Sequence, residues 1–219
     1  MTTVLGVDGC KGGWLAAEVG PSGISWQLFA SARDFLAHPC DVVAVDIPIG
    51  LPASGVRQCD VLARRALPGQ ASSVFSAPVR PVLGAQTYAE ARAISVGVDG
   101  RSLSAQCFGI VPKIAEVDRA LRGRSGAEVL EVHPEVSFRA LTRDRLPSKR
   151  TAAGRDVRLA ALRTWLPVEL PSPPPGRAAI DDCLDALVCA WTGARWLAGE
   201  AQVLGGEVDA TGQVMRIVV

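Results

Sequence analysis

The stretch Val4-Leu5-Gly6-Val7-Asp8-Gly9-Cys10-Lys11-Gly12-Gly13-Trp14 combines an apolar run, one acid and a glycine-rich turn. The apolar run predicts a buried strand over residues 3–8, and the glycines predict a turn into a second strand that begins at Trp14. A carboxylate at the end of a buried strand is costly unless it is paired or holds a metal ion. Asp8 is therefore the first candidate functional residue.

A second acid of this kind follows after two more strands and a helix. Residues 14–30 predict two antiparallel strands, and residues 31–36 predict a short helix. Residues 42–50 form the most apolar run of the chain, which is typical of a central parallel strand, and Asp46 is its one charge. If the first and fourth strands are parallel neighbours, Asp8 and Asp46 lie close together.

The rest of the chain predicts an insertion followed by a largely helical half. Residues 53–126 are longer than a crossover connection needs, and they predict an inserted cap with a helix over 103–121 that Pro112 kinks or splits. Further elements are predicted as a fifth strand at 128–135, helices at 136–141, 154–166 and 180–198, and a hairpin at 203–219. The order predicts a single α/β domain over residues 1–219. Its sheet is mixed and five-stranded, with three antiparallel meander strands and two parallel ones, flanked by helices and interrupted by the helical or irregular insertion after strand 4.

The composition excludes several classes of protein. Hydrophobic residues make up 48% of the 219, which excludes global disorder, and the net charge of +1 shows no overall basic balance. The six cysteines include no C-x-x-C pair, which favours reduced thiols over a disulfide framework or a zinc site. The sequence shows no signal-peptide pattern and no uncharged run near the roughly 20 residues that cross a bilayer, so we expect a cytoplasmic protein without membrane contact.

The third acidic site is Asp181-Asp182-Cys183-Leu184-Asp185, at the start of the long predicted helix. Asp182 and Asp185 are three residues apart and share a helix face. Clustered carboxylates raise one another's pKa unless a cation relieves their repulsion, and oxygen ligands suit Mg²⁺ or Mn²⁺. Asp181 and Asp182 could instead cap the helix, but Asp185 lies too deep for that role. Asp8 could also be a turn residue, and Asp46 a strand-ending hydrogen-bond acceptor.

The four acids resemble the acidic site of the RNase H-like superfamily, especially of its RuvC resolvase-like branch. That branch places one acid on the first strand, one on the fourth, and a pair on a late helix before Ala-Leu, which Asp8, Asp46, Asp182 and Asp185-Ala186-Leu187 match in turn. Most of the chain also resembles an uncharacterised bacterial and archaeal family described as predicted RNase H-like nucleases, through residues 6–14, 46–51, 73–80, 112–118, 131–135 and 181–186. The branch usually has Glu on the fourth strand, where this chain has the shorter Asp46.

The resemblance implies an RNase H-like fold and a hydrolase that cuts nucleic acid, either DNA or RNA. Asp8, Asp46, Asp182 and Asp185 would be both the catalytic residues and the ligands of Mg²⁺ or Mn²⁺. Two such ions about 3.5–4 Å apart can activate a water and stabilise the leaving oxygen of a phosphodiester.

Six further residues are candidate substrate contacts: Lys11, Arg80, Lys113, Glu131, His133 and Glu135. The three cations could bind phosphate. His133 could be a general base, a ligand or a hydrogen-bonded structural residue. Glu116 and Asp118 are expected to face solvent on a helix.

Residues 139–163 are strongly basic. Seven Arg and Lys149 stand against Asp144 and Asp156, which leaves a local net charge of +6. Such a run could contact a phosphate backbone, or it could be a solvated Arg-rich loop and helix.

Two other functions fit the same fold. Sugar kinases and actin-like ATPases also place an Asp and a Gly-rich turn on their first strands, and residues 9–13 could then hold phosphates through backbone N–H groups. That class normally needs two copies of the fold, and the chain shows no repeat. A non-catalytic nucleic-acid-binding or scaffold protein would retain the acids for structure. The sequence contains no P-loop lysine, no G-x-S-x-G and no G-x-G-x-x-G after the first strand.

Overall fold

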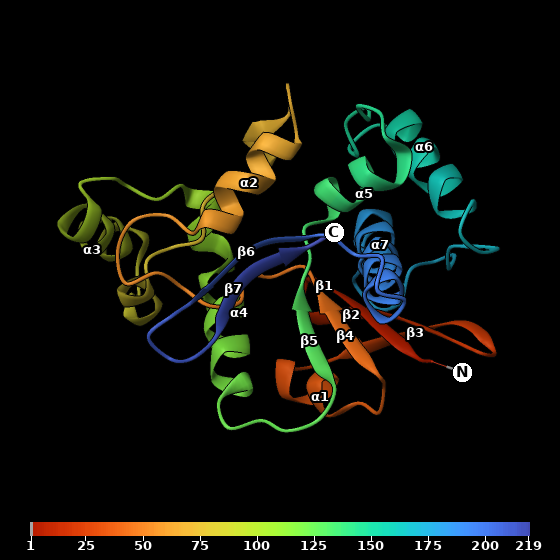
Figure 1. Cartoon of the computed structure of the whole chain (residues 1–219), viewed down its shortest axis with the longest axis horizontal. Coiled ribbons are helices and arrows are strands. Elements are labelled where there is room, and N and C mark those ends of the chain that lie inside the picture. The colour runs from red at the N-terminus through yellow and green to blue at the C-terminus, as the bar shows by residue number, and fades with distance from the viewer. Residues whose placement is uncertain (1) are drawn as a thin grey trace. The chain divides into compact units, whose positions relative to one another are not determined.

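The computed structural model describes residues 2–219 and confirms the predicted α/β fold (Figure 1). The strands are β1 (Val4–Cys10), β2 (Gly13–Gly20), β3 (Gly23–Phe29), β4 (Val42–Val45), β5 (Glu128–Glu131), β6 (Val203–Val208) and β7 (Val214–Val218). The α-helices are α1 (Ala32–Ala37), α2 (Gln58–Ala66), α3 (Tyr88–Asp99), α4 (Ala105–Leu121), α5 (Pro134–Thr142), α6 (Ala152–Leu162) and α7 (Ile180–Leu197), and short 3₁₀ helices span Ala71–Ser73 and Arg80–Gly84.

The chain divides into two compact units. The first contains the residues up to Ile47, together with Arg124–Gln202 and Val218–Val219, and the second contains Pro48–Gly123 and Val203–Ile217. The second unit therefore includes most of the predicted cap together with most of the terminal hairpin. The sequence pattern predicts a single domain, and it contains no sign that the hairpin belongs with the insertion.

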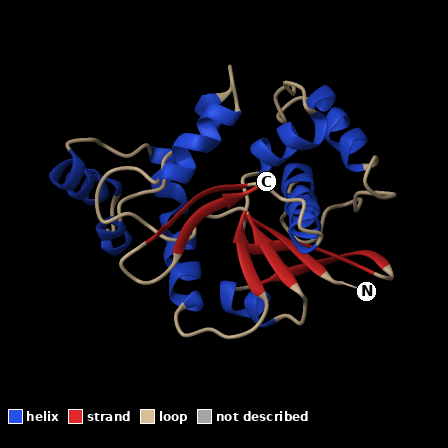
Figure 2. Ribbon diagram, in the orientation of Figure 1, coloured by secondary structure: helices blue, strands red, loops and turns tan. Residues whose placement is uncertain are grey.

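The first unit is built on one five-stranded sheet in the order β3-β2-β1-β4-β5 (Figure 2). β2 is antiparallel to both β1 and β3, whereas β4 is parallel to both β1 and β5. This is the predicted mixed sheet. Helix α7 packs against β1, β2 and β4, and α5 and α6 pack against α7. The apolar runs of β1 and β4 are buried because α7 covers them.

Four segments differ from the sequence-based prediction, and the first is β1, which continues past Asp8 to Cys10. β4 ends at Val45, because Pro48 has no N–H to extend the ladder. β5 ends at Glu131, because Pro134 begins α5 with His133 as its N-cap residue. Of the two effects predicted for Pro112, the split of the helix is wrong, and a kink stays a prediction. α4 runs as one helix across it, and buried side chains such as Val111 and Ile114 hold the helix on both sides.

The cysteines and helices agree with two further expectations. All six cysteines are free thiols, and five of them are buried. Within residues 2–219, no helix has the length and apolar character that a membrane crossing requires.

Candidate active site

Helix α7 lies directly on β1 because Gly6 has no side chain. A Cβ added to Gly6 would lie 2.1 Å from the carbonyl oxygen of Ala186 and 2.4 Å from the nitrogen of Ala190. Further along the helix, a Cβ on Gly193 would lie 2.6 Å from a methyl group of Val4. α7 therefore runs antiparallel to β1, and its first turns lie beside the end of the strand that carries Asp8.

Asp8 and Asp46 come from neighbouring parallel strands. Val7 is paired with Val45, and the amide of Asp46 donates to the carbonyl oxygen of Val7 at 2.9 Å. Asp8 is buried and Asp46 is half-buried. The charges of Asp46 and Asp185 both act on Asp8, and Asp185 also acts on Asp46. We call Asp8, Asp46 and Asp185 the acidic cluster.

Burial and mutual repulsion oppose ionisation of the acidic cluster. Burial, followed by the charges of Asp46 and Asp185, raises the pKa of Asp8 well above its ordinary 3.8. Burial and the Asp185 charge raise the pKa of Asp46 to about 8. Burial raises the pKa of Asp185 to about 6, although Lys149 acts in the opposite direction. All three carboxylates can be ionised at neutral pH only if a cation compensates them.

Lys149 supplies one positive charge to the acidic cluster. Its Nζ lies 2.5 Å from Oδ2 of Asp185, and its side chain is 39% exposed. Burial opposes the charged lysine, but the charges of Asp185, Asp46 and Asp8 raise its pKa above the ordinary 10.5. The other oxygen of Asp185, Oδ1, is buried and has no hydrogen-bond partner among the described residues. The ammonium therefore satisfies only half of the Asp185 carboxylate.

The loop before α6 holds Lys149 in place. Arg158, which is buried in α6, donates from Nη1 to the carbonyl oxygen of Pro147 at 2.8 Å. A Cβ on Gly154 would lie 2.0 Å from the carbonyl oxygen of Ser148, so the loop packs directly on the start of α6. The backbone next to Lys149 is therefore fixed by close contacts.

Asp182 serves as a helix cap. Its Oδ2 accepts a hydrogen bond from the amide of Ala179 at 2.8 Å, which closes the start of α7. Its charge still contributes to the raised pKa of Asp8. Of the two roles that the sequence left open for Asp182, the structure shows capping. Ligation of a metal ion by Asp182 stays a prediction.

The three candidate residues around the end of β5 have separate roles. Glu131 is buried, pairs with Val45 in the sheet register, and its charge raises the pKa of Asp46. His133 is the N-cap residue of α5. Glu135 accepts hydrogen bonds from Nη2 of Arg158 at both carboxylate oxygens, 2.9 and 2.8 Å away. The charges of Glu131 and Glu135 therefore both raise the pKa of Asp46, although Glu135 is also committed to its ion pair with Arg158.

In this structure the acidic cluster contacts an ammonium through Asp185. Within the described part of the chain, no group of three or more His, Cys, Asp or Glu side chains is already arranged to hold a metal ion. A metal ion at these acids would therefore require their side chains to close around it.

A family model described as "Protein of unknown function (DUF429)" matches residues 6–210. The chain belongs to the DUF429 family. The matched range contains all three residues of the acidic cluster, as well as Lys149. No curated protein and no solved structure matched the chain.

The three candidate phosphate-binding cations of this DUF429 chain occupy different settings. Lys11 is exposed in the turn between β1 and β2, and Lys113 is half-buried on α4. Arg80 bonds to Asp118 at 2.9 Å and also to Asp209, so its guanidinium has a structural role within the second unit. The expectation that Asp118 faces solvent is wrong, because the ion pair with Arg80 allows it to be buried.

The basic run over residues 139–163 does not act as one solvated surface. Lys149 pairs with Asp185, and Arg158 is buried against Glu135. Sequence reasoning missed Lys149 as a site residue because it counted this lysine with the surrounding arginines. The one feature of the sequence that could have singled out Lys149 is that it is a lysine in a run of arginines. Only three of the 23 basic residues are Lys, and an ammonium is more compact than a guanidinium.

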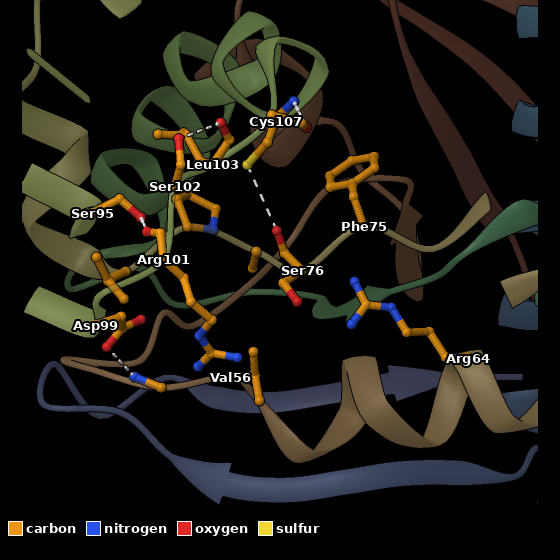
Figure 3. A pocket seen from close by; sticks show the side chains of 15 residues that line it. Val56, Arg64, Phe75, Ser76, Ser95, Asp99, Arg101, Ser102, Leu103 and Cys107 are labelled. Carbon is orange, nitrogen blue, oxygen red and sulfur yellow. Dashed lines mark hydrogen bonds between the residues drawn. The ribbon is translucent and has the colours of Figure 1, made fainter. Parts of the chain in front are cut away.

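The second unit of the DUF429 chain contains a separate cavity of about 240 Å³ (Figure 3). Its wall includes Arg64, Phe75, Ser76 and Arg101, and the Sγ of Cys107 donates to the carbonyl oxygen of Ser76 at 3.6 Å. Burial raises the pKa of the Cys107 thiol to about 11, which argues against a nucleophilic thiolate there. None of the acidic cluster lines this cavity.

Proposed function

We propose that this DUF429 chain is a metal-dependent phosphodiesterase that hydrolyses nucleic acid, with Asp8, Asp46 and Asp185 as its catalytic acids. The observation that carries the proposal is a set of three carboxylates whose charges act on one another, two of them buried and one paired with an ammonium. Such grouping raises their pKa values and costs folding stability. Groups perturbed in this way are concentrated at functional sites.

The acidic cluster fits Mg²⁺ or Mn²⁺. Hard divalent cations prefer carboxylate oxygens, and Oδ1 of Asp185 is a buried acceptor without a partner among the described residues. Three ionised carboxylates and one ammonium leave a net charge of −2, which one divalent ion would neutralise. Asp8, Asp46 and Asp185 would hold the ion, which supplies activation of a water and stabilisation of the leaving oxygen.

The chain's own residues have distinct tasks around that ion. Lys149 holds Asp185 in its charged form, and its partly exposed ammonium can also contact a phosphate oxygen. Arg158 fixes the loop that carries Lys149. Glu131 adds a carboxylate beside Asp46.

The strand order and the positions of the acids support an RNase H-like relationship. The sheet has three antiparallel strands followed by two parallel ones, with Asp8 on β1 and Asp46 directly after β4. Helix α7, later in the chain, carries Asp185. The same arrangement made the sequence resemble the RuvC resolvase-like branch. The sugar-kinase or actin-like alternative normally uses two such folds, and residues 2–219 contain one five-stranded sheet of this kind.

The proposal is tested by incubating the protein with single-stranded, duplex and branched DNA and with RNA, each with and without Mn²⁺. We expect cleavage that requires Mn²⁺ and that falls at least about 100-fold in Asp8→Asn. Asp144→Asn changes an exposed acid that does not belong to the acidic cluster, and this variant should cleave normally. Hydrolysis of ATP that disappears in Asp8→Asn, without nucleic-acid cleavage, would support the kinase-like alternative instead.

A further inference from the structure

We propose that the ammonium of Lys149 fills one of the two cation positions of the acidic cluster, so that the site takes a single divalent ion. This inference rests on the proposed metal-dependent function and concerns how many ions the site holds. Two-ion phosphodiesterases place their ions about 3.5–4 Å apart. In this chain, one positive charge is already supplied by a side chain.

The two oxygens of Asp185 have different environments. Oδ2 accepts the ammonium of Lys149 at 2.5 Å, and Oδ1 is buried without a hydrogen-bond partner among the described residues. Asp185 is only 2% exposed, so water cannot readily satisfy Oδ1. A carboxylate that bridges two metal ions uses one oxygen for each. Asp185 can therefore bridge one ion and the ammonium.

The charge of the acidic cluster with Lys149 favours one ion over two. When all three carboxylates are ionised, Asp8, Asp46 and Asp185 with Lys149 carry a net charge of −2, which a first divalent ion brings to zero and a second brings to +2. If the neighbouring Glu131 is counted as ionised, the same steps run from −3 to −1 and then to +1. In both counts a second ion reverses the sign of the site, and a net charge in a buried site is costly. Only if the helix-capping Asp182 is also counted, which gives −4, would two ions leave no net charge.

The position of Lys149 is built into the fold. Gly154 brings the start of α6 against the carbonyl oxygen of Ser148, and the buried guanidinium of Arg158 holds the carbonyl oxygen of Pro147. The amide of Thr151 donates to Ser148 O at 3.1 Å and closes the turn around Lys149. A surface lysine that met Asp185 by chance would not need these contacts.

The experiment measures Mn²⁺ binding to the full chain by calorimetry and by electron paramagnetic resonance. We expect one Mn²⁺ per chain and the six-line spectrum of an isolated ion. Lys149→Gln removes the competing charge and should bind Mn²⁺ at least about tenfold more tightly. Arg150→Gln changes the exposed neighbouring cation and should leave the affinity within about twofold.

The outcomes separate this inference from the proposed function. Two Mn²⁺ per parent chain, or the spectrum of a coupled pair, would overturn the single-ion inference and leave the metal site standing. Equal affinity in the parent chain and in Lys149→Gln would also overturn it. If no variant binds Mn²⁺, the proposed metal-dependent function fails as well. The number of Mn²⁺ ions bound per parent chain decides between one ion and two even if Lys149→Gln does not fold.

Discussion

Gly6 on β1 and Ala186 on α7 meet backbone to backbone, because a Cβ on Gly6 would lie 2.1 Å from the Ala186 carbonyl oxygen. Gly6→Ala should therefore push α7 away from β1 and destabilise the protein by about 3 kcal/mol or more. Chemical denaturation measures the loss. Gly97→Ala on α3 is the control, since a Cβ there meets nothing within 4 Å and should be neutral or stabilising by up to about 1 kcal/mol. A Gly6→Ala protein of parental stability would contradict the close approach.

The metal-free protein should lose stability as the pH rises from about 4 to about 8. Burial and the Asp185 charge raise the pKa of Asp46 to about 8, so the folded chain holds a proton that the unfolded chain releases near pH 4. The stability from this proton is present at low pH and is lost as the pH rises through the folded pKa. We expect a loss of roughly 2 kcal/mol in the free energy of unfolding, because the half-buried position of Asp46 leaves it partly screened by solvent. Thermal unfolding in a chelator at several pH values measures it, and Asp46→Asn should make the curve less steep, with the remaining slope coming from Asp8 and Asp185.

Asp209 should show the opposite pH dependence in the second unit. Burial opposes ionisation, but hydrogen bonds from the Leu51 amide and from Thr211 lower the pKa of Asp209 to about 2. Its contribution is therefore present above about pH 4 and is lost as the pH falls to about 2. Asp209→Asn should lose about 2 kcal/mol at pH 7 and much less at pH 2. Acid titration followed by circular dichroism tests this, and an equal loss at both pH values would contradict it.

Arg158→Lys should destabilise the first unit although it keeps the charge. The buried guanidinium bonds both oxygens of Glu135 and the carbonyl oxygen of Pro147, which a single ammonium cannot reproduce. We expect a loss of about 2–4 kcal/mol in the free energy of unfolding. Arg155→Lys, one turn earlier on α6, is the matched control and should change stability by less than about 0.5 kcal/mol. Similar losses in both variants would argue against a specific role for Arg158.

Mn²⁺ should protect the parent chain more than Asp185→Asn against heat. A ligand that binds only the folded state raises its stability, by about 2.7 kcal/mol at 100 times the dissociation constant. Asp185 supplies the unpartnered Oδ1, so its replacement should remove most of the shift in Tm. Thermal unfolding with and without Mn²⁺ measures the difference. Equal shifts would place any bound ion elsewhere.

Local sequence patterns determined the sheet and the positions of three acids within it. The apolar runs of β1 and β4 predicted buried strands, and Asp8 and Asp46 were the single acids in or beside them, so the sequence alone singled out these two residues. Asp185 stood out for a similar reason, because an acid within an apolar helix is too deep to be a cap.

Only the tertiary structure decided the partners of these acids. Lys149 lies 36 residues before Asp185 and reaches it through contacts of its loop with α6, which no local pattern records. The burial of Asp118 likewise depends on Arg80, 38 residues earlier. Sequence periodicity reports which residues are buried, since burial follows the repeat of a strand or helix. Which charge meets which depends on loop packing, and loop packing is set by the completed fold.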